Sequence, residues 1–443
     1  MYMKRDLVGL LVLNFLLVVL LGAMKSYAAT INAASVSYSD VQEAVASATS
    51  GDTVVIPPGT ATWSSTLVIT KSLTLKGAGA DKTVIKADGI TTIIKVSVQG
   101  DHTIDISGLT LDANNIEGSN CLNIINTSTA PLYKIRIHHN KFTHAGYMSI
   151  RAKGNVFGLI DHNQFVDNNY DLKIYGNDRE TWRDFPGLAN IGTANYLYIE
   201  DNESSGADQM ILASGEGARW VYRYNRIDMK NSENTVDQLF DAHGDTRNAG
   251  VVAHEIYENI AYTSGIRDAT TPAFKMHDYR GGTGLIYNNT VDAGTSGVRT
   301  FINVREEYQG CTDPEGNCWD SSCGGDKVNN GYIWNNINSR DGKILAVWEG
   351  DPYDCIAEDA NWWDDASHDP GGESPSNFTY GISADRPAAC ANNDCYWETD
   401  TKKLYRCKGD NNWVFVYSPH TYPHPLQGGA ESPPPEPKNL RLK

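Results

Sequence analysis

An alternating apolar strand that ends at an asparagine recurs along the middle of this chain and restricts how it can fold. Seven copies end at Asn140, Asn163, Asn202, Asn225, Asn259, Asn289 and Asn336, and the successive separations are 23, 39, 23, 34, 30 and 47 residues. A shortest unit with insertions of variable length is typical of a solenoid, in which each repeat packs only on its neighbours. Asparagine tolerates the left-handed conformation of a sharp turn, and stacked asparagine amides can pair in a ladder. We therefore expect stacked coils that each turn at an asparagine.

The chain divides into four expected segments. Residues 1–29 have a short positive start, an apolar run over Leu7–Met24 and small residues at its end, which predicts a signal peptide. An uncleaved membrane anchor is the alternative, since the run is just long enough to span a bilayer. We assign residues 30–389 to the solenoid, 390–427 to a cysteine- and aromatic-rich hairpin, and 428–443 to a disordered proline-rich tail.

Composition narrows the possible compartments and partners. Eight cysteines, seven of them in the last third, favour an oxidising compartment and disulfides whose pairing the sequence does not fix. With the signal peptide, they predict a secreted or periplasmic protein. The formal net charge of −17 argues against nucleic acid as a partner, since phosphate binding needs a basic surface. We expect a monomer that does not bind a membrane after the signal is removed.

A short helix is expected before the first coil. Ser39 and Asp40 are candidates to cap the segment 41–48, with Glu43 placed for a capping box. An amphipathic helix at this position would cover the open end of the solenoid.

Each coil is also expected to carry a strand before its asparagine strand, and alternation along these strands predicts which side chains face outward. The expected inward set is Ile150, Ala152, Leu172, Ile174, Met210, Leu212, Phe240, Ala242, Phe274, Met276, Ile302 and Val304. The expected outward set is Arg151, Lys173, Tyr175, Asp241, His243, Lys275, His277, Asn303 and Arg305. Most of the outward residues are basic, and residues of adjacent coils lie within side-chain reach. A basic face on an acidic protein suggests a polyanionic ligand.

Two stretches carry a resemblance to a known family. GDTVVIPPGTATW and LVITKSLTLKGAGADKTVI resemble the opening of pectin-lyase-like right-handed parallel β-helix proteins, and the repeated Ile-x-x-Asn strands resemble the same superfamily over residues 36–345. The ending YSPHTYPHPLQ resembles the C-termini of secreted bacterial β-helix proteins. The resemblance implies an all-β, right-handed parallel β-helix with an N-terminal capping helix and a disulfide-pinned C-terminal hairpin. It does not imply one activity, since the superfamily contains lyases, hydrolases, esterases and non-catalytic proteins.

The outward face suits the cleavage of an acidic polysaccharide by β-elimination, which needs a cation for the uronate carboxylate and a base for the adjacent proton. Arg280 or Arg305 is expected to pair with the carboxylate, and Lys275, His277 or His243 to be the base. Asp241 would orient a histidine or hold a Ca²⁺ ion. In the lyases that the fold resembles, a lysine or arginine is typically the base and calcium is common. The expected substrate-binding residues are Arg151, Lys173, Tyr175, Trp182, Arg183 and Asn303.

Three alternatives stay open at this stage. A glycoside hydrolase needs two carboxylates, which Asp241 could supply together with Asp278 or Glu306 if the strands kink. A transition metal could be held by Asp241, His243 and His277. A non-catalytic carbohydrate-binding or structural surface protein would use the same face without cutting the ligand.

Overall fold

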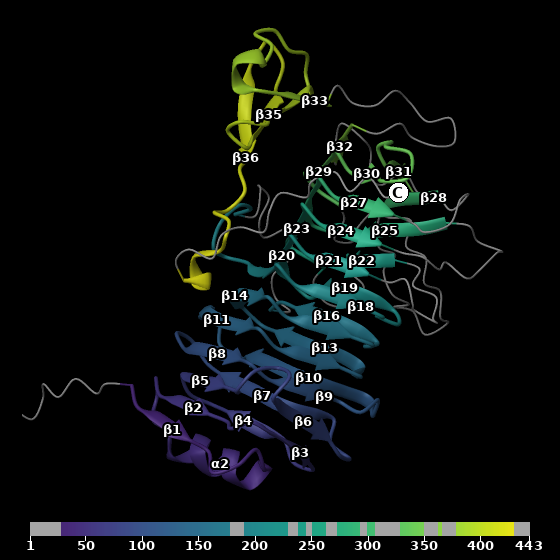
Figure 1. The fold of residues 1–443 in the computed structure, drawn as a ribbon. Coiled ribbons are helices and arrows are strands. Elements are labelled where there is room, and N and C mark those ends of the chain that lie inside the picture. The colour runs from purple at the N-terminus through teal and green to yellow at the C-terminus, as the bar shows by residue number, and fades with distance from the viewer. Residues whose placement is uncertain are drawn as a thin grey trace, which may run out of the picture.

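The computed structural model describes residues 28–177, 190–228, 238–244, 250–262, 273–292, 299–305, 328–349, 362–365 and 378–428. Within these ranges, no helix has the length and apolar character needed to cross a membrane. In the three large sheets, each strand pairs in parallel with the equivalent strand one coil later. The result is a parallel β-helix whose coils stack from the N-terminal end to the C-terminal end (Figure 1).

Three parallel sheets form the walls of the helix. Sheet A consists of β1 (Thr30–Asn32), β2 (Thr53–Val55), β5 (Leu73–Lys76), β8 (Thr103–Ser107), β11 (Leu132–His138), β14 (Val156–Asp161), β17 (Leu197–Glu200), β20 (Arg219–Arg223), β23 (Ala253–Tyr257), β26 (Thr283–Tyr287), β29 (Gly331–Trp334) and β32 (Trp362–Asp364). Sheet B consists of β3 (Gly59–Trp63), β6 (Thr83–Ala87), β9 (Thr110–Asp112), β12 (Lys141–Thr143), β15 (Gln164–Val166), β18 (Glu203–Ser205), β21 (Arg226–Asp228), β24 (Ile260–Tyr262), β27 (Thr290–Asp292) and β30 (Ile337–Asn338). Sheet C consists of β4 (Leu67–Ile69), β7 (Thr92–Val98), β10 (Glu117–Asn126), β13 (Gly146–Lys153), β16 (Tyr170–Tyr175), β19 (Met210–Gly215), β22 (Gln238–Ala242), β25 (Ala273–Tyr279), β28 (Arg299–Val304) and β31 (Ala346–Glu349).

The main hydrophobic core fills the inside of the helix. Aliphatic and aromatic side chains alternate inward along the strands of all three sheets, which is the pattern that burial of one strand face demands. The prediction of inward residues on sheet C is confirmed for those that are buried in this core: Ile150, Ala152, Leu172, Ile174, Leu212, Phe240, Ala242, Met276, Ile302 and Val304.

The repeated asparagines form the expected ladder at the corner between sheets A and B. Asn163 Oδ1 accepts from the backbone N–H of Asn140 at 3.0 Å and from its side-chain amide at 3.2 Å, and the same pattern continues from coil to coil as far as Asn336. We expected the asparagine to adopt the left-handed conformation. In the structure the residue before it does so instead, such as His139 or His162. The asparagine is instead required by its amide, which joins each coil to the next.

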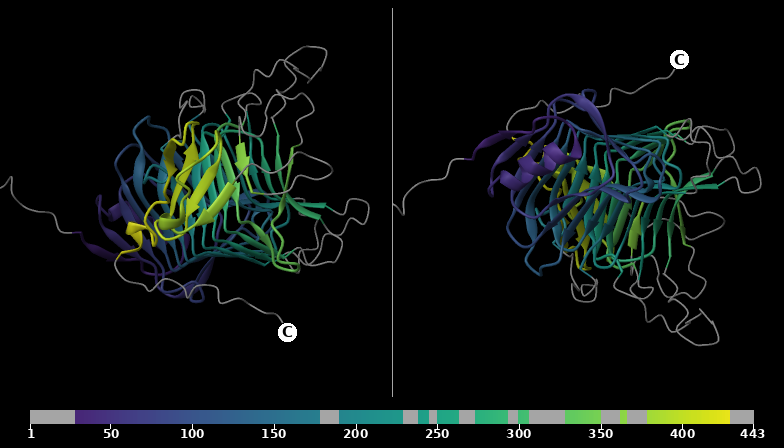
Figure 2. Two further views of the ribbon diagram at one scale, coloured as in Figure 1. Left: turned by 90° about the horizontal axis from the view of Figure 1, so that it is seen from above. Right: turned by 90° about the horizontal axis from the view of Figure 1, so that it is seen from below.

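A helix covers the N-terminal end of the coil stack (Figure 2), as predicted. It is α2 (Tyr38–Ser47), which begins three residues before the predicted segment. Its N-cap is Ser37, whose hydroxyl accepts from the backbone of Asp40, so the expected cap at Ser39 and Asp40 is wrong. At the other end, Lys71 donates to the last carbonyl groups of the helix, including that of Val45 at 2.9 Å.

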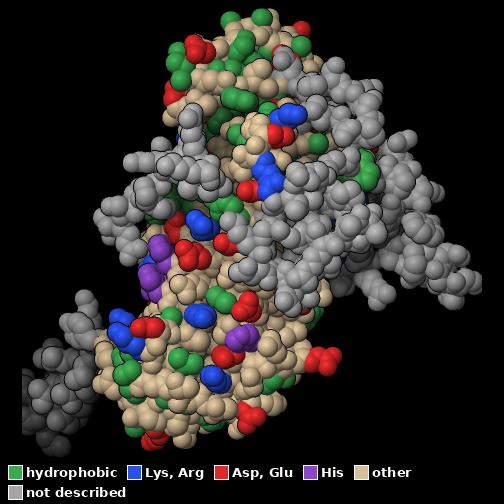
Figure 3. Space-filling model, turned by 45° about the vertical axis from the view of Figure 1, so that its right-hand side comes forward, with side chains coloured by type: hydrophobic (Ala, Val, Ile, Leu, Met, Phe, Trp, Pro, Cys, Tyr) green, Lys and Arg blue, Asp and Glu red, His purple; other side chains and the backbone are tan. Residues whose placement is uncertain are grey.

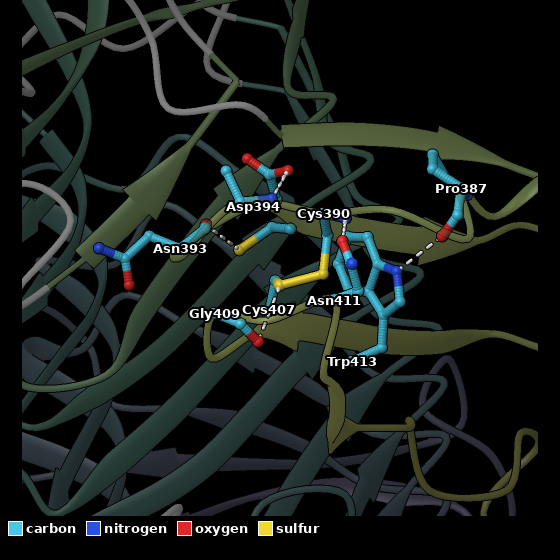
Figure 4. Close-up of a disulfide and its surroundings, with 10 residues drawn as sticks. Pro387, Cys390, Asn393, Asp394, Cys407, Gly409, Asn411 and Trp413 are labelled. Atoms are coloured by element: carbon cyan, nitrogen blue, oxygen red, sulfur yellow. Dashed lines mark hydrogen bonds between the residues drawn. A yellow bond between two sulfur atoms is a disulfide. The ribbon is translucent and has the colours of Figure 1, made fainter.

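A small separate sheet follows the β-helix. It consists of β33 (Phe378–Gly381), β34 (Cys395–Glu398), β35 (Lys403–Cys407) and β36 (Trp413–Tyr417), with a 3₁₀ turn η2 (Ser383–Asp385). The disulfide Cys390–Cys407 fastens the segment before β34 to the end of β35 (Figure 4). The expected disulfide-pinned hairpin is therefore confirmed. Cys311, Cys318, Cys323 and Cys355 lie outside the described residues.

This C-terminal sheet packs on the outer face of sheet A and builds a second core there (Figure 2). Sheet A presents stacked aromatic rings outward, with the centroids of Tyr257 and Tyr287 4.6 Å apart and those of Tyr287 and Trp334 4.2 Å apart. Trp397 of β34 and Tyr417 of β36 close over them. An aromatic face of this kind is stable in water only when it is covered.

After β36 the chain runs back along sheet A as a strap, residues 418–428, which ends in the 3₁₀ turn η3 (Pro425–Gln427) beside β14 (Figure 1). Beneath it lies the sheet A cluster, which consists of Glu200, Arg223 and Glu255. The guanidinium of Arg223 donates to Glu200 at 2.6 Å and to the carbonyl oxygens of His420 and Thr421 in the strap. The C-terminal ending YSPHTYPHPLQ is thus a structural clamp in this chain.

Candidate functional site

The outward residues of sheet C form a column that crosses the coils. The strand register places Arg151 beside Lys173, and Asp241 beside Asp278. Asn303 follows Asp278 on the next coil. Neighbouring strands lie about 4.8 Å apart, so each of these side chains is within reach of the next.

One irregularity changes the predicted column. The pairing of β25 with β28 shifts between Lys275 and His277, so Met276 is an extra residue of the kind found in a β-bulge. After this bulge, His277 pairs with the core residues Phe240 and Ile302, and Asp278 takes the outward position. The expected outward position of His277 is therefore wrong, because simple alternation was continued through a bulge.

His277 belongs to the core instead. Its Nε2 atom lies 2.9 Å from Nε2 of His254, and both side chains are completely buried. Burial lowers the pKa of His277 to about 4 and that of His254 well below its usual value. A residue in this position cannot contact a polymer on the outside of the helix, so we withdraw it from the candidate catalytic residues and from the candidate metal ligands.

Three consecutive coils bring the other predicted residues together with Asp278. We call this group the sheet C cluster, which consists of Asp241, His243, Lys275, Asp278, Arg280, Asn303 and Arg305. Its two carboxylates and three permanent cations come from β22, β25 and β28 and from the residues that directly follow these strands.

Asp241 organises one half of the cluster. Its carboxylate accepts from Arg280 Nε at 3.0 Å and from Arg280 Nη2 at 2.5 Å, and it lies 3.0 Å from His243 Nε2. Burial alone would raise the pKa of Asp241, but the hydrogen bonds and charges of His243 and Arg280 hold it well below the usual range. Asp241 is therefore an anion that positions an imidazole and a guanidinium.

Asp278 organises the other half. It accepts from the Asn303 side chain at 2.8 Å and from Arg305 at 3.0 and 3.1 Å, and Lys275 Nζ lies 3.4 Å away. Burial opposes the charge on this carboxylate, but Arg305, then Arg280 and Lys275, lower its pKa. Arg280 Nε lies 3.7 Å from Asp278, so the two halves form one ionic network.

The carboxylates of the network are buried, and three of the groups that they bind are partly exposed to solvent. Asp241 and Asp278 are only 4% and 2% exposed. The side chains of His243, Lys275 and Arg305 are 39%, 27% and 21% exposed. These three groups are the ones that can contact a bound molecule, and each is held in place by a buried carboxylate.

Calcium does not fit these residues. Both oxygens of Asp241 already accept from Arg280, and both oxygens of Asp278 accept from Arg305. A hard cation prefers several oxygen ligands, and here it would have to displace guanidinium groups. Within the described residues, no group of three or more histidine, cysteine, aspartate or glutamate side chains is arranged to hold a metal ion.

The remaining predicted residues divide into two groups. Arg151, Lys173 and Tyr175 lie on the same face of sheet C, toward the N-terminal end from the cluster. Trp182, Arg183 and Glu306 lie outside the described residues. The sequence predicts Asp278 near the site only if the strands kink, and the bulge between Lys275 and His277 is what brings it to the centre of the cluster.

Comparison with known proteins supports no assignment beyond the fold. No family model and no curated protein matches the sequence. Among solved structures, an alginate lyase from Paenibacillus sp. str. FPU-7 is similar at 14% identity with a TM-score of 0.44, covering 77% of this chain and 95% of that chain. ORF18 of Geobacillus virus E2 is similar at 12% identity and a TM-score of 0.37, with coverages of 88% and 86%. A pectin methylesterase mutant in complex with a hexasaccharide is similar at 12% identity and a TM-score of 0.32, with coverages of 77% and 94%.

The fold itself is defined by the geometry of this chain. Three parallel sheets, one strand of each per coil, and an asparagine ladder at one corner make the architecture of the pectin-lyase-like parallel β-helix. Because this architecture serves several reactions, the activity must be argued from the sheet C cluster.

Proposed function

We propose that this protein binds an acidic polysaccharide on the outer face of sheet C and cleaves it by β-elimination. The observation that carries the proposal is the sheet C cluster, in which a solvent-accessible imidazole is held by a buried carboxylate beside two accessible cations. His243, Lys275 and Arg305 come from consecutive coils, so they face one stretch of an extended ligand.

The proposed roles follow from the partly exposed side chains. Arg280 Nη2 lies 2.8 Å from Nδ1 and 2.9 Å from Nε2 of His243, so the substrate must displace this contact to reach the imidazole. Arg305 and Lys275 contact the uronate carboxylate and offset its charge, which acidifies the proton on the carbon next to it. His243 removes that proton, and Asp241 stabilises the imidazolium that forms. The electron pair of the broken C–H bond becomes a C=C bond, and the bond to the glycosidic oxygen on the adjacent carbon breaks. That oxygen takes up a proton and leaves as a hydroxyl group.

Hydrolysis is the weaker alternative on electrostatic grounds. A glycoside hydrolase needs one carboxyl group that is protonated and donates to the leaving oxygen. Asp241 and Asp278 occupy adjacent coils, but cationic neighbours lower the pKa of both. Neither carboxyl group therefore holds a proton at neutral pH.

The test is incubation of the purified protein with pectate, alginate and glucuronan while ultraviolet absorbance is followed. A rise with one polymer, from the new conjugated double bond, is the expected result. His243→Gln should abolish the rise without loss of folded protein, and Lys134→Met, which alters an exposed ion pair on sheet A, is the matched control. New reducing ends without absorbance would mean hydrolysis, and binding without either signal would mean a non-catalytic carbohydrate-binding protein.

A further inference from the structure

A lysine surrounded by tyrosines lies on sheet C, toward the N-terminal end from the cluster. Lys173 Nζ is 5.1 Å from the ring centroids of both Tyr147 and Tyr170 and 5.7 Å from that of Tyr175. It also donates to the Tyr147 hydroxyl at 3.1 Å. We call these four side chains the tyrosine cage. The rings hold the ammonium group in one place through cation–π attraction, without the help of an acid.

The cage is extended by an arginine on the preceding coil. Arg151 is in register with Lys173, and its guanidinium lies 5.5 Å from the ring centroid of Tyr175. Among the described residues, no carboxylate forms an ion pair with Lys173 or Arg151. The cations of the sheet C cluster, by contrast, each have a carboxylate partner. The protein has a net charge of −17, but the two adjacent cations Lys173 and Arg151 have no acidic partner in the part of the chain that the structure describes. They therefore create a local positive potential that attracts an anion.

The cage is accessible and its rings suit a sugar. Tyr147 is 36% exposed, and Tyr170, Lys173 and Tyr175 are half-buried. Tyrosine supplies a flat apolar face for a pyranose ring and a hydroxyl for its oxygens. Tyr170 is further fixed by a hydrogen bond from its hydroxyl to Gln209 at 2.6 Å. The side chains are thus positioned before any ligand arrives.

The cage and the sheet C cluster share one face and stand at a fixed separation. Lys173 belongs to β16, and its register continues through Ala213 and Asp241 to Asp278 of β25, so Lys173 and Asp278 are three coils or about 14 Å apart. Between them, β19 contributes the small residues Ala213 and Gly215, which are both buried. Burial raises the pKa of the Tyr170 hydroxyl, and the charge of Asp241 adds a smaller contribution in the same direction.

We propose that the tyrosine cage with Arg151 is a second anion-binding subsite, which holds the carboxylate of one uronate while the sheet C cluster holds another on the same chain. The ligand is then a linear polyuronate that lies across the coils and carries carboxylates on separate sugars. The two places are about 14 Å apart by the coil spacing. A chain of about four sugars is needed to span this distance. This inference rests on the proposed function for the identity of the polymer, but the cage can be tested by binding alone.

The experiment compares wild type with Lys173→Met, Tyr147→Phe and the control Lys134→Met in calorimetric titrations with pectate, alginate and glucuronan and with size-fractionated oligomers. We expect Lys173→Met to weaken the binding of long oligomers at least tenfold, to leave the binding of disaccharides unchanged, and to raise KM with little change in kcat. Tyr147→Phe should weaken long-oligomer binding by a smaller factor, because it removes one hydroxyl but keeps the ring. Near-ultraviolet circular dichroism confirms that each variant is folded.

The outcomes separate this inference from the proposed reaction. Elimination that proceeds with the same KM and the same dependence on oligomer length in Lys173→Met overturns the subsite and leaves the lyase proposal standing. Loss of long-oligomer binding in Lys173→Met, without elimination by the wild type, supports the subsite and overturns the lyase proposal. Absence of polyuronate binding by the wild type overturns both.

Discussion

Two outer faces of the same β-helix carry buried arginine–carboxylate pairs, and they differ in what surrounds them. On sheet A, Arg223 and Glu200 are completely buried, and the strap satisfies both of them with backbone groups. On sheet C, Asp241 and Asp278 are buried, but their partners His243, Lys275 and Arg305 reach solvent.

The comparison teaches how to distinguish a structural charge cluster from a candidate site. In the sheet A cluster, every charged group is used to attach the C-terminal part of the chain. In the sheet C cluster, the carboxylates hold cations and an imidazole, and the side chains of His243, Lys275 and Arg305 are partly exposed. A buried ion pair alone is weak evidence of function, because either arrangement perturbs the pKa of its carboxylates.

The largest effect is expected from breaking the sheet A cluster. Arg223→Met leaves Glu200 buried without its partner, which should lower the free energy of unfolding by about 3–5 kcal/mol. Chemical denaturation measures this loss, and the folded fraction should bind polyuronate as the wild type does. Arg223→Met combined with Glu200→Gln should recover part of the stability. A loss of polyuronate binding by folded Arg223→Met would mean that the two faces are not independent.

The next effect concerns the sheet C cluster and should appear in activity instead of stability. His243→Gln removes the proposed base from a partly exposed position, so turnover should fall by about a hundredfold or more. Denaturation curves should remain close to those of the wild type. A variant that unfolds more easily but keeps its turnover would assign His243 a structural role.

A third test uses pH, because the pKa values of the carboxyl groups are raised in the sheet A cluster and lowered in the sheet C cluster. Burial raises the pKa of Glu255 above its ordinary 4.5, so its contribution to stability is present at low pH and is lost as pH rises through the folded value. Asp278 has a folded pKa below its ordinary 3.8, so its contribution is present above that pH and is lost as pH falls through the folded value.

Denaturation of wild type, Glu255→Gln and Asp278→Asn across the acidic range measures these contributions. The stability difference between wild type and Glu255→Gln should grow as pH falls, and that between wild type and Asp278→Asn should shrink. Slopes of the same sign for the two variants would contradict the contrast between the faces.

The smallest effect on stability is expected from single exposed lysines. Lys275→Met and Lys134→Met should each change the free energy of unfolding by no more than about 1 kcal/mol, because pairs near the surface contribute little. Only Lys275→Met should weaken polyuronate binding, as measured by titration at low and moderate salt. Equal effects of the two variants on binding would point to a general charge effect.

The features that repeat along the chain were predictable from the sequence, and those that depend on distant packing were not. The asparagine spacing predicted the ladder, and alternation predicted the buried face of sheet C, because every coil repeats the same physical requirement. The bulge at Met276 is not part of simple alternation, so His277 was predicted on the wrong face. Arg223 was missed because its partners in the strap lie almost two hundred residues later in the sequence, with separations of 197 and 198.

The flank of the molecule that Figure 3 shows is not distinguished by charge alone. Acidic and basic side chains are interspersed over it. The candidate site is therefore recognised by its buried carboxylates and the partly exposed groups that they bind. Finding these contacts requires the register of the strands in the structure.

The asparagine ladder keeps each coil in the same position relative to its neighbours, whatever the number of residues in the coil. Consecutive ladder residues are between 23 and 47 residues apart, yet each amide meets the next in the same geometry. Extra residues are thus accommodated between the corners, and the strands on either side return to the same phase. In a β-helix of this kind, the connections between strands can be lengthened or exchanged, and ligand specificity can change with them, while the side chains on the strands keep their spacing.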